Sequence, residues 1–376
     1  MCINSIYCDF IDVKRKYNFF LTDSRSRSIV CKRFYVSTYM MRLMMKRIAT
    51  IYDVAEAAGV SIATVSRVLN APSRVSLLSK QKVLAAMEEL DFVPKADAVA
   101  RARRDFRRIG VIVPFLTSPS FVQRIRGITG ALASTEYELV IYSIETQEQL
   151  QDYYISLPVS RKVDGLIILA LPVHDDDAAR FKEFGMPVVL VEIENSQLSG
   201  IQIDNERGGT MAADHLLTKG YRDLGFIGEG GQPAYSLHAT DERFYGFRKE
   251  IEKQGGVFRE ENAIFHDYGM DKTVEASKKL LSGPKPPRAL FAASDLEAVG
   301  VLTAARELGL RVPEDVAVIG FDDIDLAGYM GITTINQSLD ESGRTAATLL
   351  LEKMKSPGRT ARNIMLSLKI VERFTT

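Results

Sequence analysis

The sequence of 376 residues predicts an α/β fold of two doubly wound lobes with parallel sheets, preceded by a small unit that is entirely helical. Short apolar runs such as Ile109–Val113, Gly165–Leu169 and Val188–Val191 alternate with helical patterns across residues 109–376. This alternation favours parallel strands that are covered by helices on both faces. Residues 50–90 instead show only the helical period. The length suits two or three domains, each large enough to bury a core.

A second set of apolar runs repeats the pattern of the first set later in the chain. Its expected strands are Leu224–Ile227, Ala263–Phe265, Ala289–Ala292 and Val316–Ile319. In doubly wound folds, ligands bind where the strands end, and two such lobes form a cleft between them. The sequence therefore predicts a cleft for a small molecule between two lobes.

The composition is that of a soluble globular protein, with 46% apolar and 26% charged residues. Because no stretch approaches the roughly 18 consecutive apolar residues of a membrane helix, we expect no membrane partner. All three cysteines, Cys2, Cys8 and Cys31, precede residue 44. They show neither a disulfide framework nor a zinc-binding spacing, which favours a reducing, cytoplasmic location.

The net charge of zero hides an asymmetry along the chain. Residues 1–108 contain 20 Lys or Arg and 10 Asp or Glu, whereas residues 109–376 contain 28 and 38. A basic front and an acidic body indicate a polyanionic partner for the front. A merely solvated basic face would give the same counts.

Residues 1–44 show no clear helical or strand period and are expected to be a non-homologous extension. Lys14, Arg15 and Lys16 argue against a signal peptide. We expect the natural start near Met44 or Met45; the alternative is a real basic arm.

The stretch Thr50–Asn70 predicts two short helices joined by a tight turn. Val54 lies on the apolar face of the first helix, Gly59 permits the sharp turn, and Ser61 is placed to cap the second helix, in which Val65 faces the core. Such a pair forms a helix-turn-helix, whose second helix suits the major groove of DNA. A third helix follows, capped by Ser76, with a buried stripe of Val83, Leu84, Met87 and Leu90.

These helices, together with Val75-Ser76 and Phe92-Val93-Pro94, resemble the LacI/GalR family of bacterial transcriptional repressors. The resemblance extends from about Ile48 to Thr376. It implies a helix-turn-helix DNA-binding domain over residues 45–94 and a hinge helix over residues 95–108. It also implies that residues 109–376 form a two-lobed effector-binding and dimerisation domain, similar to periplasmic sugar-binding proteins.

The resemblance implies DNA contacts residue by residue. Ile62 and Ala63 would meet base edges, where apolar side chains touch groups such as the thymine methyl, and Arg67 would bond guanine or phosphate. For Tyr52 and Thr64 the alternative is local packing and capping. The residues suited to phosphate contacts are Thr50, Tyr52, Ser61, Thr64 and Ser66.

The hinge departs from the family pattern. Arg101 occupies the place where the family has a leucine that enters the minor groove. An arginine suits a narrow, electronegative minor groove but is no apolar wedge. With Arg103 and Arg104 it is expected to contact phosphate or the minor groove; the alternative is a solvated linker.

In the body, the resemblance rests on the stretches Ile203–Glu206, Arg243 with Gly246-Phe247, Ser294-Asp295 and Gly320–Asp323, and it marks Thr333–Ile335 as the last crossover between lobes. It implies that Arg243 and Asp295 face one another, that Asp204 lies at a crossover and that Tyr268 stacks on the ligand. The expected effector-binding residues are Phe115, Ser118, Phe121, Asp204, Arg243, Tyr268 and Asp295.

Carboxylates, a bidentate arginine and aromatic faces suit a sugar, and we favour it over a nucleobase, which the same residue types also accommodate. Two alternatives stay open for single residues. Asp295 could cap the helix that begins near Leu296, and Arg243 could form a surface ion pair.

The sequence shows no nucleophile, metal-ligand spacing or phosphate loop, so we expect no enzyme and no cofactor. A transport-type sugar-binding protein would lack the helix-turn-helix. The favoured function is an effector-responsive repressor of carbohydrate-related genes, acting as a homodimer on a palindromic operator.

Overall fold

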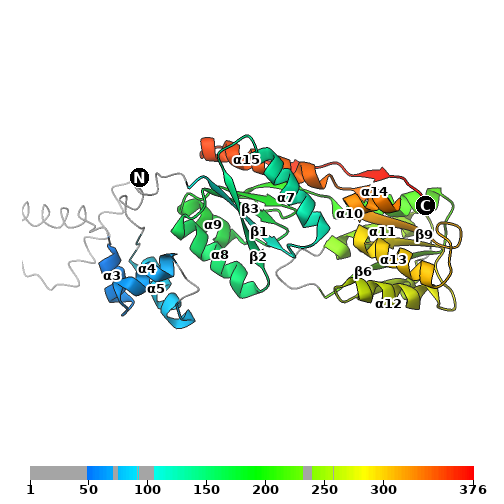
Figure 1. The fold of residues 1–376 in the computed structure, drawn as a ribbon, viewed down its shortest axis with the longest axis horizontal. Coiled ribbons are helices and arrows are strands. Elements are labelled where there is room, and N and C mark those ends of the chain that lie inside the picture. Colours follow the sequence, from blue (N-terminus) through cyan, green and yellow to red (C-terminus); the bar gives the residue numbers. More distant parts are fainter. Residues whose placement is uncertain (1–48, 71–74, 91, 93–105, 232–238, 257) are drawn as a thin grey trace, which may run out of the picture. The chain divides into compact units, whose positions relative to one another are not determined.

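The structure, a computed structural model, describes residues 49–70, 75–90, 92, 106–231, 239–256 and 258–376 (Figure 1). The chain divides into two compact units, Met1–Val65 with Leu77–Val93 and Ser66–Ser76 with Pro94–Thr376. Among the helices of these described ranges, none is long and apolar enough to cross a membrane.

The described residues before position 93 form the helices α3 (Ile51–Ala57), α4 (Ile62–Asn70) and α5 (Leu77–Glu89). Helix α3 begins with a capping box: the Thr50 N–H donates to Asp53 Oδ2 at 2.6 Å, and the Asp53 N–H donates to Thr50 Oγ1 at 3.4 Å. Gly59, with φ +63°, makes the turn into α4. The apolar side chains buried here include Val54, Val65, Val83, Met87 and Phe92.

The first lobe contains a six-stranded, fully parallel sheet. In spatial order its strands are β11 (Asn363–Met365), β5 (Ser199–Gln202), β4 (Val188–Val191), β3 (Gly165–Leu169), β1 (Arg108–Pro114) and β2 (Glu138–Ile144). Its helices are α7 (Pro119–Leu132), α8 (Gln147–Ser160), α9 (Asp175–Glu183) and α15 (Leu339–Lys355). Because neighbouring residues of a strand face opposite ways, Val111 and Val113 pack under α7 and α15, whereas Ile112 packs in the core beneath α8 and α9.

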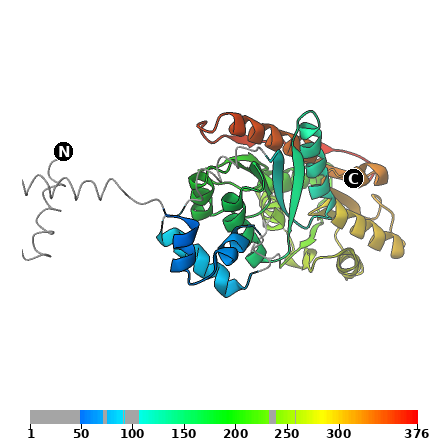
Figure 2. The same cartoon turned by 60° about the vertical axis from the view of Figure 1, so that its left-hand side comes forward.

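The second lobe repeats this design with helices on both faces of its sheet (Figures 1 and 2). In spatial order its strands are β12 (Lys369–Val371), β10 (Thr333–Asn336), β9 (Ala317–Asp322), β8 (Ala289–Ala292), β6 (Leu224–Glu229) and β7 (Ala263–His266). Among the described strands of this sheet, only β12 runs antiparallel to its neighbour. The helices are α10 (Asn205–Thr218), α11 (Ala239–Lys253), η2 (Glu260–Asn262), α12 (Met270–Leu281), α13 (Asp295–Glu307) and α14 (Asp325–Met330).

The chain crosses between the two sheets three times. It passes from β5 into α10, from β10 into α15, and from β11 to β12. The expectation that Thr333–Ile335 marks the last crossover was wrong, because β11 in the first sheet and β12 in the second sheet make a further one. Each of these two strands has three residues, too few for an alternation of apolar and polar side chains to stand out.

Each lobe contains one pair of helices whose backbones touch at glycines. Helix α7 crosses α15, where a Cβ on Gly127 would lie 1.9 Å from the Asp340 carbonyl oxygen and one on Gly343 would lie 2.0 Å from the Arg124 carbonyl oxygen. Helix α10 crosses α11 in the same reciprocal way, through the pair Gly209 and Gly246. There the added Cβ atoms would lie 1.9 Å from the carbonyl oxygens of Arg243 and Glu206.

These crossings give the first prediction. Gly127→Ala is expected to lower the free energy of unfolding by about 1–3 kcal/mol, since the methyl group forces two backbones apart. Gly130→Ala, one turn along the same helix with nothing within 4 Å of the added Cβ, is expected to raise it by up to about 1 kcal/mol through helix propensity. Urea unfolding of both variants measures the difference. Equal effects would show that α7 and α15 are not in backbone contact.

Candidate functional site

Helix α4 separates its side chains into a buried and an exposed face. Val65 and Val68 are buried, whereas Ile62, with 43% of its surface exposed, Ala63 and Arg67 face solvent. The family resemblance implied base contacts for Ile62 and Ala63 and a contact to guanine or phosphate for Arg67. The exposed face of α4 thus offers two apolar side chains and one guanidinium group to a partner.

The hydroxyl groups expected to contact phosphate are partly used inside the helical unit. The Thr50 side chain caps α3, and Ser61 Oγ accepts from the Thr64 N–H at 3.2 Å and lies 2.9 Å from Thr64 Oγ1. Tyr52 is 67% exposed, so local packing does not account for its position. Ser66 is half-buried, and Arg101 lies outside the described residues.

The larger unit contains a cavity of about 160 Å³ whose walls come from both lobes. Five residues expected at the effector site line it: Phe115, Ser118, Phe121, Arg243 and Tyr268. Charged residues and an amide that were not predicted from the sequence as effector-binding also line the cavity. They are Arg124, Glu192, Glu229, Glu297, Asp322 and Gln337.

One wall of the cavity is aromatic. The rings of Phe115 and Tyr268 stack with their centroids 5.7 Å apart and an angle of 15° between their planes. Phe115 has φ +46°, a left-handed conformation that non-glycine residues adopt at a cost. The loop after β1 therefore holds Phe115 against Tyr268, the second residue after β7.

The first lobe contributes Arg124, which is buried on α7. Its guanidinium group donates to both carboxylate oxygens of Glu192, at 2.7 and 3.0 Å. It also donates to Ser342 Oγ at 3.2 Å and to Gln337 Oε1 at 2.8 Å. A bidentate pair of this kind fixes the orientation of the guanidinium plane.

The second lobe contributes Arg243, which is buried on α11. It donates to Asn205 Oδ1 at 2.9 Å and to the Ala293 carbonyl at 2.7 Å, and it covers the Phe321 ring at 3.6 Å from the centroid. Its nearest carboxylate is that of Asp322, at 3.8 Å. Burial lowers the pKa of Arg243, but a guanidinium group stays charged in proteins. Because it is buried, the surface ion pair left open by the sequence does not describe it.

Gln337 links the two arginines across the lobes. Its side-chain oxygen accepts from Arg124, and its side-chain nitrogen donates to Asp322. Gln337 directly follows β10, so it sits on the second of the three crossovers. Burial raises the pKa of Asp322 to about 6, which leaves its carboxylate ionised at neutral pH.

Two expected effector residues do not line this cavity. Asp295 is 0% exposed, and its buried carboxylate accepts from the Ile324 N–H at 2.9 Å and from the Thr334 hydroxyl at 2.5 Å. It neither faces Arg243, whose nearest acid is Asp322, nor caps α13, where Ser294 is the N-cap residue.

Asp204 lies at the first crossover, as expected, but it caps α10 by accepting from the Arg207 N–H at 2.8 Å. It lines a separate open hollow next to Asp241 and Tyr245. Its carboxylate is therefore engaged in a local structural role away from the cavity.

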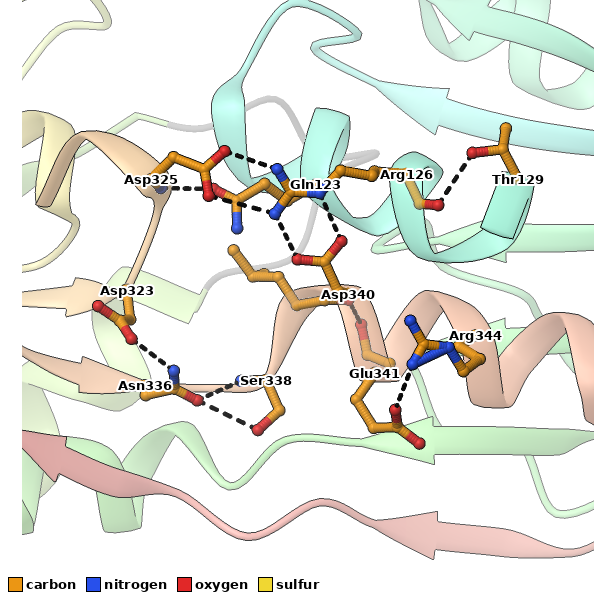
Figure 3. A network of polar contacts seen from close by, with 12 residues as sticks. Gln123, Arg126, Thr129, Asp323, Asp325, Asn336, Ser338, Asp340, Glu341 and Arg344 are labelled. Atoms are coloured by element: carbon orange, nitrogen blue, oxygen red, sulfur yellow. Dashed lines mark hydrogen bonds and ion pairs between the residues drawn. The ribbon is translucent and has the colours of Figure 1, made fainter. Parts of the chain in front are cut away.

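Outside the cavity, Arg126 of α7 ties the first lobe to the second. Figure 3 shows its guanidinium group between Asp325 and Asp340. It donates to Asp325 Oδ2 at 2.6 Å and to Asp340 Oδ1 at 2.7 Å, and Gln123 Oε1 accepts from the Asp325 N–H at 2.8 Å. Asp325 begins α14 of the second lobe, so these bonds join the two lobes.

The described residues include no group of three or more His, Cys, Asp or Glu side chains arranged to hold a metal ion. Within the described part of the chain, the candidate site residues form the exposed face of α4 and a polar and aromatic cavity between the two lobes.

Two family models match the chain. The model described as bacterial regulatory proteins of the lacI family covers residues 50–95, and that of the periplasmic binding protein-like domain covers residues 213–376. They include α3, α4, α5 and most of the second lobe. They confirm the expected family and the expected combination of a helix-turn-helix with two parallel-sheet lobes.

Curated relatives match most of their own length. The HTH-type transcriptional repressor PurR of Photobacterium profundum is 31% identical over 310 residues, which are 81% of this chain and 91% of the relative. The repressor of the same name from Yersinia pestis (strain Pestoides F) is 32% identical over 331 residues, 86% of this chain and 96% of the relative.

Solved structures of similar proteins also match, each at a probability of 1.00. The transcriptional regulator CelR–cellobiose complex is 29% identical with a TM-score of 0.64, covering 87% of this chain and 100% of the other. A LacI family transcriptional regulator from Enterococcus faecium with bound ribose is 27% identical and has a TM-score of 0.63. The match covers 72% of this chain and 98% of the other. The lac repressor dimer bound to operator and the anti-inducer ONPF is 28% identical and has a TM-score of 0.63. The match covers 88% of this chain and 99% of the other.

The helix-turn-helix, the two lobes and the match to named repressors along most of their length all lead to one conclusion. The chain belongs to the LacI family of bacterial regulatory proteins and is a transcriptional repressor of that family.

Proposed function

We propose that this repressor binds operator DNA through α4 and that a small molecule in the cavity between the lobes controls this binding. The observation that carries the proposal is the chain of bonds from Arg124 through Gln337 to Asp322, which brings polar groups of both lobes to one cavity. A ligand that contacts both lobes binds one arrangement of them better than another. It therefore shifts the equilibrium between those arrangements.

On the DNA side, the exposed face of α4 has the chemistry of a recognition helix. Ile62 and Ala63 would contact apolar groups such as the thymine methyl, while Arg67 would bond guanine or phosphate. One such helix reads few base pairs, so two copies related by a two-fold axis would read a palindrome. The similar lac repressor structure, described as a dimer bound to operator, supports a homodimer.

We infer that the effector is a carbohydrate and that the genes under control are carbohydrate-related. The cavity combines carboxylates, arginines and an aromatic wall, which suit hydroxyl groups and the apolar face of a sugar. A flat base inserted between two aromatic rings would need the rings about 7 Å apart, which is twice the carbon contact distance. The Phe115 and Tyr268 rings have their centroids 5.7 Å apart, so a base does not fit between them. Two similar structures are described with cellobiose and ribose.

A nucleobase is the second candidate, because it would use the same acceptor and donor groups. Thermal unfolding in the presence of neutral sugars and of free nucleobases separates the two. A ligand at 100 times its Kd is expected to add about 2.7 kcal/mol of stability. The same compounds are then tested for release or tightening of operator DNA in a mobility-shift assay. Stabilisation by nucleobases alone would replace the sugar in the proposal.

The proposal extends to the remaining expectations from the sequence. Residues 45–94 would form the DNA-binding domain, residues 95–108 the hinge, and residues 109–376 the effector-binding and dimerisation domain, in a cytoplasmic protein without catalytic activity. Residues 1–44 would be an extension that operator binding does not need.

The effector cavity gives the second prediction. Arg243→Ala is expected to weaken effector binding about tenfold or more, since a lost charged hydrogen bond costs about 1–3 kcal/mol. Arg248→Ala changes an exposed arginine on the same helix and serves as the control. Calorimetric titration of the effector measures both. Equal affinity in the two variants would remove Arg243 from the site.

The recognition helix gives the third prediction. Arg67→Ala is expected to flatten the slope of log affinity against log salt by about one unit for each subunit that contacts DNA. Lys285→Ala, an exposed change in the larger unit, is the control. Salt titrations of operator binding measure both slopes. An unchanged slope for Arg67→Ala would place Arg67 away from phosphate and base.

A further inference from the structure

The start of helix α14 is held by a residue of the opposite lobe. The first N–H groups of any helix have no carbonyl partner within the helix itself. Ile324, the N-cap residue of α14, has an apolar side chain that cannot accept from them. Instead, Gln123 Oε1 on α7 of the first lobe accepts from the Asp325 N–H at 2.8 Å. One lobe therefore caps a helix of the other lobe.

Arg126 adds ion pairs at the same point (Figure 3). Its guanidinium group donates to both carboxylate oxygens of Asp325, at 2.6 and 3.2 Å, and to both of Asp340, at 2.7 and 2.5 Å. Asp325 is the first residue of α14, whereas Asp340 lies in the first turn of α15 on the first lobe. Because a guanidinium group binds a carboxylate through two parallel bonds, Arg126 ties α14 to the helix pair α7 and α15.

These ion pairs stand in water, unlike the bond between the lobes through Gln337. The side chains of Arg126 and Asp325 are 51% and 56% exposed, whereas Gln337 is buried. Exposed ion pairs compete with water and are screened by salt, so each contributes little stability and breaks readily. The contact between Arg126 and Asp325 can therefore open while both lobes stay folded.

A short segment joins this contact to the cavity. Asp322 and Ile324 line the cavity, and Asp325 follows directly. The backbone of the segment is constrained, with φ +117° at Asp322 and +58° at Asp323. Asp323 also accepts from Arg373 of the second lobe at 2.6 Å. The segment therefore moves as one body with the second lobe, and a ligand that draws Asp322 toward the first lobe also draws Asp325 toward it.

We propose that Gln123 and Arg126 form a latch on α14, which sets how often the lobes separate and thereby how tightly a small molecule is held between them. Both would be positioning residues, since neither is among the described residues that line the cavity. The proposal rests on the proposed role of the cavity as the effector site. Apparent affinity scales with the fraction of molecules in the binding arrangement, so a latch that favours this arrangement before a ligand arrives strengthens binding.

Hydrogen exchange of the Asp325 amide, read by NMR on the full chain without added compound, tests the latch. The acceptor of this amide lies on the other lobe, so the amide is released when the lobes separate. Arg126→Ala is expected to speed its exchange about two- to fivefold, the range of an exposed ion pair. Arg126→Lys keeps the charge without the paired bonds and should fall between. Loss of a positive charge alone would slow exchange, because hydroxide catalyses it at neutral pH, so faster exchange reports opening.

Arg344→Ala is the matched control, because it removes an exposed arginine whose ion pair with Glu341 stays within α15. It should leave exchange at Asp325 unchanged. The amides of α12, on the second lobe away from the latch, should be unchanged in every variant. Unchanged exchange at Asp325 in Arg126→Ala, an equal rise in Arg344→Ala, or a rise that α12 shares would overturn the latch.

Small molecules test the link between the latch and the cavity. Ribose, cellobiose and adenine are titrated by calorimetry into the natural protein and into Arg126→Ala. A compound that binds is expected to bind Arg126→Ala about two- to fivefold more weakly and to slow exchange of the Asp325 amide in the natural protein. Equal affinity for both forms, or unchanged exchange at Asp325 in the bound protein, would overturn the link. Binding of none of the three would count against the proposed effector cavity, while exchange without compound would still decide the latch.

Discussion

Backbone contact between helices fixes the two arginines of the cavity. In the first lobe, the carbonyl of Arg124 lies against Gly343 of α15, and in the second lobe the carbonyl of Arg243 lies against Gly209 of α10. A side chain larger than hydrogen at either glycine would push the arginine-bearing helix outward. The position of each guanidinium group is thus set by a helix crossing on its own lobe, before any ligand is present.

The two crossings matter together because Gln337 spans the distance between them. Its amide matches two fixed groups, a guanidinium donor from α7 and a carboxylate acceptor at the end of β9. An amide has the one donor and one acceptor that this bridge requires, whereas a carboxylate or an ammonium group has only one kind. A ligand that competes for either end would loosen the bond between the lobes, and one that adds to both ends would strengthen it.

Elements with a local apolar signal could be predicted from the sequence. The runs Gly165–Leu169 and Val188–Val191 coincide with β3 and β4, and the apolar pattern of α4 gives its buried face. The strands β11 and β12 could not be predicted, since their three residues form edges of sheets made elsewhere in the chain.

The cavity was predictable only in part. Phe115, Arg243 and Tyr268 follow from the family resemblance, and Asp322 lies in a stretch that carried the resemblance, three residues after a predicted strand. Glu229 and Glu297 gave no such signal, because they are 68 positions apart in the sequence and meet only when β6 and α13 pack in one lobe. Asp295 was predicted to bind the ligand because it follows a strand end, a local signal that does not show its long-range hydrogen bonds to the Ile324 N–H and the Thr334 hydroxyl.

The three crossovers have a mechanical consequence. A single connection would leave one lobe free to twist, slide and bend relative to the other. Three connections, at the points where the chain leaves β5, β10 and β11, resist twisting and sliding and leave bending as the soft motion. A protein body with one soft motion converts many different contacts in its cavity into the same displacement. Its output would then depend on how far the hinge bends and little on which contact bends it.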